Sequence, residues 1–196
     1  MRKLRIFEHI SLDGVIQNST DENNFPYNNW TEPYRTPAGR DIVLGLYGER
    51  YDLLLGRRTY DNWSGFWSKA PSHPMSDRIN AAKKYVVTHR PDSLAWGPFE
   101  GLSQNIVEDV RRVKSQDGPD VILPGSSTLT SPLLEHGLAD EIVLFVYPVL
   151  LGTGKRIFAD GTPARAFELA NTKALPAGIV INTYKPSGPL RTSPIS

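Results

Sequence analysis

Residues 121–158 read VILPGSSTLTSPLLEHGLADEIVLFVYPVLLGTGKRIF, and this stretch decides the expected fold more than any other part of the chain. Residues 121–123 predict a short buried strand, residues 124–127 a turn, and residues 128–136 an amphipathic helix that ends at Gly137. A strand, a glycine turn and a helix N-terminus direct backbone N–H groups and the positive end of the helix dipole toward one point, which suits an anion. An ordinary strand-to-helix turn without a ligand would show the same pattern.

The rest of the chain alternates between short apolar runs and segments with helical spacing. We expect strands at residues 4–10, 51–55, 84–88 and 141–146, helices at 36–50, from about 59, at 75–82 and at 103–114, and loops at 17–39, 66–74 and 91–101. This alternation predicts an α/β fold, a three-layer sandwich with helices on both faces of a mostly parallel central sheet. Two further strands, 166–175 and 178–184, are separated only by Pro176 and Ala177, which predicts an antiparallel C-terminal hairpin.

Three glycines mark the expected binding edge of this sheet. Gly14, Gly56 and Gly125 each lie in a turn that follows an expected strand. Ligands of open α/β sheets bind outside the carboxyl ends of the strands. The three turns are therefore expected to converge on one site.

Composition excludes several classes of protein. A chain of 196 residues is expected to form one domain, residues 1–185, followed by a flexible tail, 186–196, that is rich in Pro and Ser. A net charge of +1 gives no field that favours nucleic acid or an anionic membrane, and no apolar run approaches the roughly 18 residues of a membrane span. The absence of cysteine excludes thiol catalysis and Cys-ligated zinc, and no metal site is expected. Glu8 and His9 interrupt the apolar N-terminal stretch, so the cytoplasm is the default location.

Four sequence blocks occur in an order that is typical of one known superfamily. They are ISLDGVI at 10–16, LLGRRTY at 54–60, Asn80 with KYVVT at 84–88, and the stretch 121–158. The first three resemble the patterns S-L-D-G-x-I, G-R-x-T and N-x-x-x-K-x-V-x-S/T, and the last resembles G-S-x-x-L followed by P-V-x-L-G-x-G. The chain thus resembles the dihydrofolate reductase-like superfamily over roughly residues 3–185, in particular the branch of the RibD C-terminal domain, the reductase domain of riboflavin biosynthesis.

This resemblance implies a dihydrofolate reductase-like fold, NADPH as cofactor, a small-molecule substrate and a homodimer. The residues that it assigns to cofactor binding are Val15, Ile16, Gly56, Arg57, Arg58, Thr59, Thr88, Arg90, Gly125, Ser126, Ser127, Thr128, Gly152 and Gly154. Among these, Val15 and Ile16 would form an apolar floor for the nicotinamide. Gly152 and Gly154 would allow close approach to the same ring, although a hairpin-like turn without a ligand has the same composition.

Arg57 and Arg58 favour NADPH over NADH. Guanidinium groups at the carboxyl end of a strand suit bidentate recognition of phosphate, and the 2′-phosphate of NADPH adds negative charge there. Thr88 and Arg90 follow another expected strand, near the adenine ribose in the resemblance. A solvated basic turn is the alternative interpretation of Arg57 and Arg58.

Substrate and proton-donor residues are harder to assign. The candidates for the substrate pocket are Asp13, Trp30, Phe66 and Trp67. Asp before Gly is also common turn chemistry, and the aromatic residues could equally be core or dimer contacts. Asp41, close to the position of the dihydrofolate reductase carboxylate, is the candidate proton donor, with an exposed helix acid as the alternative. Pro124 stands where riboflavin-pathway reductases carry a glutamate.

Three functions are consistent with these residues. The first is an NADPH-dependent reductase that delivers hydride to a small planar heterocyclic or imine-containing substrate, pterin- or pyrimidine-like. The second is the 5-amino-6-(5-phosphoribosylamino)uracil reductase of riboflavin biosynthesis, which Pro124 disfavours. The third is a non-catalytic NADPH-binding or redox-sensing protein, which the lack of an evident proton donor keeps open.

Overall fold

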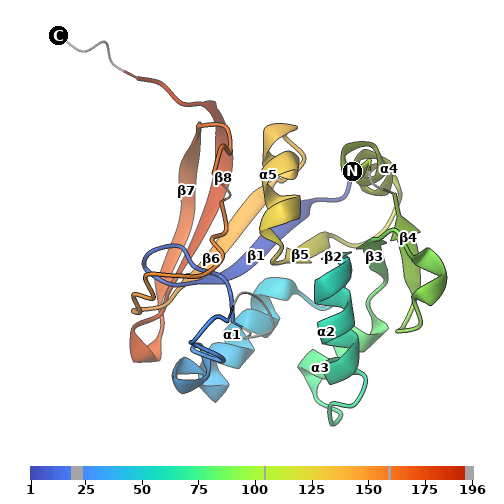
Figure 1. The fold of residues 1–196 in the computed structure, drawn as a ribbon, viewed down its shortest axis with the longest axis horizontal. Coiled ribbons are helices and arrows are strands. Elements are labelled where there is room, and N and C mark those ends of the chain that lie inside the picture. The colour runs from blue at the N-terminus through green and yellow to red at the C-terminus, as the bar shows by residue number, and fades with distance from the viewer. Residues whose placement is uncertain (19–23, 104, 159, 193–196) are drawn as a thin grey trace.

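The computed structural model describes residues 1–18, 24–103, 105–158 and 160–192, which fold around one sheet (Figure 1). Its strands are β1 (Leu4–Ile10), β2 (Asp52–Gly56), β3 (Lys84–Val87), β4 (Phe99–Leu102), β5 (Val121–Pro124), β6 (Glu141–Val146), β7 (Arg165–Ala174) and β8 (Val180–Pro189). The strand order is β4-β3-β2-β5-β1-β6-β8-β7. Neighbouring strands from β4 to β6 are parallel, whereas β8 is antiparallel to β6 and β7 to β8.

Helices cover both faces of the sheet. They are α1 (Pro37–Tyr47), α2 (Arg57–Trp67), α3 (Pro74–Ala81), α4 (Ile106–Ser115) and α5 (Ser127–Glu135), with short 3-10 helices η1 (Glu32–Tyr34), η2 (Pro91–Ser93) and η3 (Pro176–Gly178). Figure 1 shows α1, α2 and α3 on one face and α4 and α5 on the other. The predicted three-layer α/β architecture with an antiparallel C-terminal hairpin is therefore confirmed. No helix in the described part of the chain is both long and apolar enough to cross a membrane.

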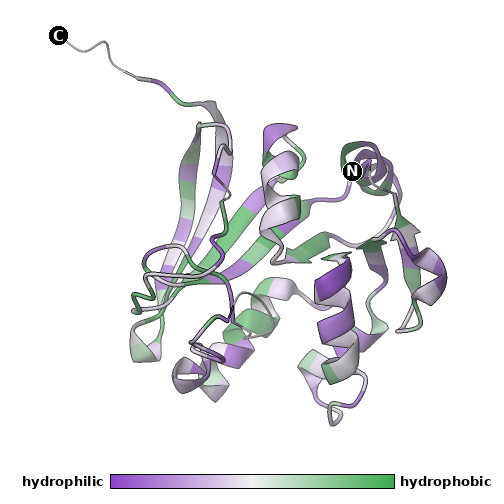
Figure 2. Ribbon diagram, in the orientation of Figure 1, coloured by the Kyte–Doolittle hydropathy of each residue, from purple (hydrophilic) through white to green (hydrophobic). Residues whose placement is uncertain are grey.

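Strand β1 lies inside the sheet and supplies side chains to two cores. Leu4 and Ile6 pack with Leu133 of α5 in one core, whereas Phe7 packs with Tyr47 of α1 in the other. Strands that are covered on both faces need apolar residues at consecutive positions. Figure 2 shows largely hydrophobic colour along β6, in contrast to the mixed colours of β7 and β8.

Helix α1 begins as expected and ends earlier. The Thr36 side chain accepts a hydrogen bond of 3.0 Å from the Gly39 N–H, and Pro37 occupies the first helical position. The helix was expected to continue to about residue 50. It ends at Tyr47 because Gly48 adopts a φ of 87°, which stops the helical hydrogen-bond pattern.

The loop prediction for residues 91–101 was wrong at its end, where β4 forms. This strand lies at the edge of the sheet, beside β3, and only Leu102 is buried in it. Gly101 lacks a side chain because a Cβ there would lie 2.8 Å from the Cβ of Pro91. A short edge strand with one buried residue carries almost no hydrophobic alternation, so its sequence pattern is weak.

Two other boundaries differ from expectation. Strand β8 runs to Pro189, so regular structure continues beyond residue 185, where the tail was expected to begin. Within the loop expected at 17–39, Phe25 and Trp30 are buried, and η1 and the start of α1 occupy its second half. Residues 19–23 of that loop and 193–196 of the tail lie outside the described residues.

Lys84, at the start of β3, is buried against the C-terminal end of α3. Its Nζ donates a hydrogen bond of 2.7 Å to the Asn80 carbonyl and lies 4.3 Å from the centroid of the Trp96 ring. Burial lowers the pKa of Lys84 to about 8. Gly97 makes this arrangement possible, because a Cβ at that position would lie 2.5 Å from Nζ. The segment around Trp96 therefore packs against α3 through Lys84.

Candidate functional site

A pocket of about 350 Å³ lies at the carboxyl ends of β2 and β5. It is lined by Ile16, Gln17, Asn18, Gly56, Arg57, Arg58, Thr59, Asn62, Ser126, Ser127, Thr128 and Lys155. The structure thus brings together much of the set that the sequence assigned to cofactor binding. Two of the three glycine turns contribute directly, through residues 56–59 and 126–128, and the third contributes through Ile16.

Two helix N-termini meet at this pocket. Helix α2 starts directly after Gly56 and α5 directly after Ser126, and neither N-cap residue caps its helix with a side chain. First-turn N–H groups without a side-chain cap are available to an anion, and the helix dipole adds partial positive charge. Arg57, Arg58 and Lys155 line the same space. These two helix N-termini and the cations beside them, called the cradle below, suit an anion.

The β2–α2 junction and the turn before α5 approach each other closely. A Cβ on Gly56 would lie 3.3 Å from the Ser126 Oγ, so a larger residue would intrude between them. Ser126 has a φ of 84°, in the left-handed region that disfavours non-glycine residues. Its Oγ lies 2.9 Å from the Thr128 Oγ1. Strain of this kind is concentrated at ligand clamps, which agrees with the position of Ser126 on the pocket wall.

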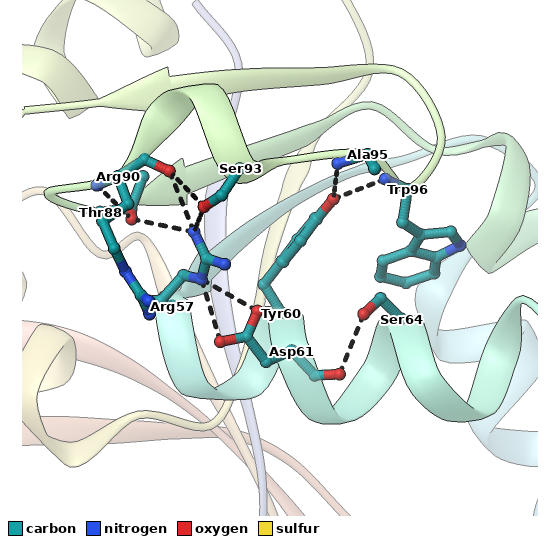
Figure 3. A network of polar contacts seen from close by, with 9 residues as sticks. All are labelled: Arg57, Tyr60, Asp61, Ser64, Thr88, Arg90, Ser93, Ala95 and Trp96. Carbon is teal, nitrogen blue, oxygen red and sulfur yellow. Dashed lines mark hydrogen bonds and ion pairs between the residues drawn. The ribbon is translucent and has the colours of Figure 1, made fainter.

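Arg57 connects the pocket to the end of β3 (Figure 3). Its Nη1 donates to the Ser93 Oγ at 2.7 Å, the Arg90 carbonyl at 3.0 Å and the Thr88 Oγ1 at 3.4 Å. Its Nε lies 2.9 and 3.0 Å from the two carboxylate oxygens of Asp61. Thr88 and Arg90, both predicted cofactor residues, are therefore linked to the pocket through Arg57, although neither lines it.

Val15, Gly152 and Gly154, which were also predicted to bind the cofactor, do not line the pocket but contact the chain next to it. A Cβ on Gly154 would lie 2.7 Å from the Val15 Cγ1, so this glycine packs directly on the buried Val15. The Ile16 N–H donates to the Lys155 carbonyl at 2.8 Å, which holds Lys155 beside the pocket. The loop of Gly152 and Gly154 therefore lies against residues 13–16.

Asp13 links the turn of residues 11–16 to the loop of Gly152 and Gly154 through hydrogen bonds. Its carboxylate accepts hydrogen bonds from the Ser11 Oγ at 2.6 Å, the Gly152 N–H at 2.9 Å and the Leu151 N–H at 3.2 Å. The bond from Ser11 is the main cause that lowers the pKa of Asp13 to about 2, with the two backbone N–H groups adding to it. The Asp13 carboxylate therefore forms its hydrogen bonds within the protein, and its predicted role in the substrate pocket stays a prediction.

We expect Asp13→Asn to lower the unfolding temperature at pH 7 by about 3–6 °C. Because the pKa of Asp13 is depressed in the folded state, its stabilisation is present above the unfolded value of 3.8 and is lost as the pH falls toward 2. Thermal unfolding at pH 7, 5, 4 and 3 should show the difference shrinking toward acid. Asp117→Asn, at an exposed position, is the control. A difference that stays constant with pH would show that the charge of Asp13 does not matter.

The other predicted residues lie outside this pocket. Asp41 is exposed on α1, and Phe66 is exposed near the end of α2, in contact with Trp67 at 4.9 Å between ring centroids. Trp30 is buried against Tyr147, and its Nε1 donates to the Gln17 carbonyl at 2.7 Å. Their predicted catalytic and substrate roles therefore draw no support from the pocket, and they stay predictions.

Gly125 lies next to the buried carboxyl group of Glu8. A Cβ on Gly125, whose φ is 78°, would lie 3.0 Å from the Glu8 Oε2. This oxygen is buried without a hydrogen-bond partner among the described residues. Burial raises the pKa of Glu8 to about 8, so the group is largely protonated at neutral pH.

We expect Glu8→Gln to stabilise the protein at alkaline pH. The raised pKa means that the native state retains a proton between the unfolded value of 4.5 and about 8, so wild-type stability falls as the pH rises through that window. The glutamine has no proton to lose, so its advantage should grow from pH 5 to pH 9 in thermal unfolding. Glu168→Gln, on the exposed strand β7, should give no such trend. Equal differences at both pH values would contradict the burial argument.

Sequence reasoning missed Gln17, Asn18, Asn62 and Lys155. Lys155 directly follows the Gly152–Gly154 turn, and a cation beside a glycine turn is a signal that could have identified it. Gln17 and Asn18 begin a loop without any periodic pattern, and Asn62 lies on α2 one turn beyond the G-R-R-T block. In the described part of the chain, no group of three or more His, Asp or Glu side chains is arranged to hold a metal ion.

Comparisons with known proteins agree with this fold. The family model of the RibD C-terminal domain matches residues 2–181. An uncharacterised protein of Bacillus subtilis (strain 168), YyaP, is 28% identical over 141 residues, which cover 69% of this chain and 74% of that protein. A putative riboflavin biosynthesis protein from Shewanella sp. PV-4 superposes with a TM-score of 0.72 at 18% identity, covering 94% of this chain and 99% of that one.

The likeness extends to dihydrofolate reductase. The enzyme from Enterococcus faecalis, in a complex with NADP(H) and RAB-propyl, superposes with a TM-score of 0.61 at 16% identity, covering 94% of this chain and 96% of that one. The fold is accordingly dihydrofolate reductase-like. The match over residues 2–181 shows that the chain belongs to the RibD C-terminal domain family.

Proposed function

We propose that this protein is an NADPH-dependent reductase that delivers hydride to a small planar substrate, a pterin- or pyrimidine-like heterocycle or an imine. The observation that carries this proposal is the pocket in which two helix N-termini and three cationic side chains meet. Membership of the RibD C-terminal domain family and a fold shared with an NADP(H)-bound dihydrofolate reductase support it.

The residues of the pocket fit a dinucleotide. Backbone N–H groups at the starts of α2 and α5 would bind the diphosphate, with Ser127 and Thr128 supplying hydroxyl groups. Arg58 and Lys155 would neutralise its charge, and Ile16 would give an apolar surface to the nicotinamide end. NADPH supplies the hydride when bound, and the protein contributes orientation and shielding from water.

Proton donation is the part that the pocket does not supply. Its lining residues include no Asp, Glu, His or Tyr among the described residues. Pro124, opposite Phe7 at the end of β5, also leaves no acid at the position of the riboflavin-pathway glutamate. This observation favours a non-catalytic NADPH-binding protein as the second candidate and disfavours the uracil reductase of riboflavin biosynthesis.

Asp41→Asn tests the one proton donor that the sequence suggests. If Asp41 donates the proton, the variant should lower the turnover number about 10-fold or more and leave NADPH affinity unchanged. Stopped-flow single-turnover rates measured at several pH values separate this step from product release. Turnover at the wild-type rate would make Asp41 an ordinary exposed helix residue.

Titration of tryptophan fluorescence with NADPH and with NADH tests the proposal as a whole. We expect micromolar binding of NADPH, followed by NADPH oxidation with at least one member of a panel of pterins, pyrimidines and cyclic imines. Binding without oxidation across the panel would favour the sensor, and no binding of either nucleotide would refute both candidates. A homodimer in the cytoplasm is a further expectation from the family resemblance, and sedimentation velocity tests its oligomeric part.

A further inference from the structure

The guanidinium group of Arg57 is already engaged within the protein. Its Nη1 faces three acceptors, the Ser93 Oγ, the Arg90 carbonyl and the Thr88 Oγ1, and its Nε faces both oxygens of Asp61 (Figure 3). Only about 20% of the Arg57 side chain is exposed. A phosphate that approaches Nε therefore meets the Asp61 carboxylate first.

Asp61 is not needed to hold Arg57 in place. The three acceptors at Nη1 come from the end of β3 and from η2, and the Arg57 guanidinium also lies 5.9 Å from the centroid of the Tyr60 ring. These contacts fix the side chain independently of the carboxylate. The contribution of Asp61 is therefore its negative charge, which cancels the positive charge of Arg57.

Another anion can replace the Asp61 carboxylate beside Arg57. The Asp61 side chain is 45% exposed and follows Arg57 by one helical turn. Exposed pairs with this spacing contribute little stability, because water screens both charges. A phosphate with nearly two negative charges can displace such a carboxylate, although the carboxylate stays nearby and repels it.

We propose that Asp61 limits the selectivity of this site for NADPH over NADH, since the 2′-phosphate must displace its carboxylate before pairing with the Nε of Arg57. The inference rests on the proposed function, in which the pocket binds the dinucleotide. Asp61 lies outside the cofactor motifs of this sequence, on the turn of α2 that follows the G-R-R-T block. Arg58 and Lys155 line the same pocket.

Asp61→Asn is the test. We expect the dissociation constant of NADPH to fall about 5- to 20-fold and that of NADH to change less than about 2-fold. Adenosine 2′,5′-bisphosphate should show the same gain as NADPH, and adenosine 5′-phosphate should show none, which assigns the effect to the 2′-phosphate. Asp92→Asn is the matched control, because it removes an equal charge from exposed η2 without touching the guanidinium of Arg57.

A double variant shows whether Asp61 acts through Arg57. In an Arg57→Met background, Asp61→Asn should no longer improve NADPH binding selectively. A loss of NADPH affinity in Asp61→Asn alone, an equal gain for both nucleotides, or a gain that persists without Arg57 would each overturn the inference. If the wild-type protein binds neither nucleotide, the proposed function itself fails. Wild-type binding with unchanged selectivity in the variant refutes only the role of Asp61.

Discussion

Gly56→Val is expected to weaken NADPH binding by about 100-fold or more while the fold is retained. Gly56 joins β2 to α2 on the pocket wall, and a Cβ there would already lie 3.3 Å from the Ser126 Oγ. The methyl groups of valine extend further, into the space between the two helix N-termini. The backbone φ of −70° is accessible to valine, so steric filling of the cradle is the dominant effect.

The measurement is a fluorescence titration of the variant with NADPH, alongside far-ultraviolet circular dichroism and thermal unfolding. Gly65→Val is the matched control, because Gly65 lies further along α2 and a Cβ there would meet no atom within 4 Å. It should bind NADPH as the wild-type protein does. An unchanged affinity in a folded Gly56→Val protein would remove the β2–α2 junction from the site.

Gly97→Ala is expected to destabilise the protein by about 2–4 kcal/mol. The residue has a φ of +68°, and the new Cβ would lie 2.5 Å from the Lys84 Nζ and 3.1 Å from the Asn80 carbonyl. The lysine side chain can bend away only by giving up its hydrogen bond to the end of α3. The backbone oxygen cannot move without shifting the helix.

Chemical denaturation of the two proteins measures this difference directly. Gly45→Ala on α1, where a Cβ meets no atom within 4 Å and φ is not positive, should be neutral or slightly stabilising. A loss for Gly97→Ala no larger than about 0.5 kcal/mol would mean that the surroundings of Lys84 yield easily.

The sequence predicted the elements whose burial or turns are strongly patterned. Strand β6 carries consecutive apolar residues from Ile142 to Val146 because both of its faces are covered, and the glycine turns at Gly56 and Gly125 mark where strands end. Strand β4 was missed because Leu102 alone is buried in it. The sequence pattern therefore located the centre of the sheet and its C-terminal hairpin, but not the edge strand β4.

The candidate site could be predicted only in part for a related reason. Residues of the cradle are adjacent in sequence to strand ends, whereas Gln17 and Asn18 reach the pocket through a loop whose path depends on tertiary packing. Trp30, which was predicted to line the substrate pocket, also depends on tertiary packing that the sequence does not reveal. An aromatic residue in a loop suits either a ligand or a core, and the sequence alone does not show that Trp30 packs against Tyr147.

Charge pairing was the least predictable feature. The spacing of Arg57 and Asp61 permits a helical ion pair, yet the same arginine was expected to face a phosphate. Which anion it meets is decided by the direction of its side chain, and that direction is set by Ser93 and Arg90 from a different part of the chain. No local pattern contains that information.

The position of β1 has a consequence for how the chain reaches its native state. Its two neighbours in the sheet, β5 and β6, lie far from it in the sequence. Leu4 pairs with Val121 of β5, and Arg5 pairs with Glu141 of β6. Strand β5 follows β2, β3 and β4 in the sequence, yet it must insert between β2 and β1 in the sheet. Long-range parallel pairing of this kind loses much chain entropy before any contact compensates for it. Docking of β5 beside β1 is therefore expected to limit the rate of refolding, and fragments that stop before residue 121 should aggregate through the uncovered edges of β1.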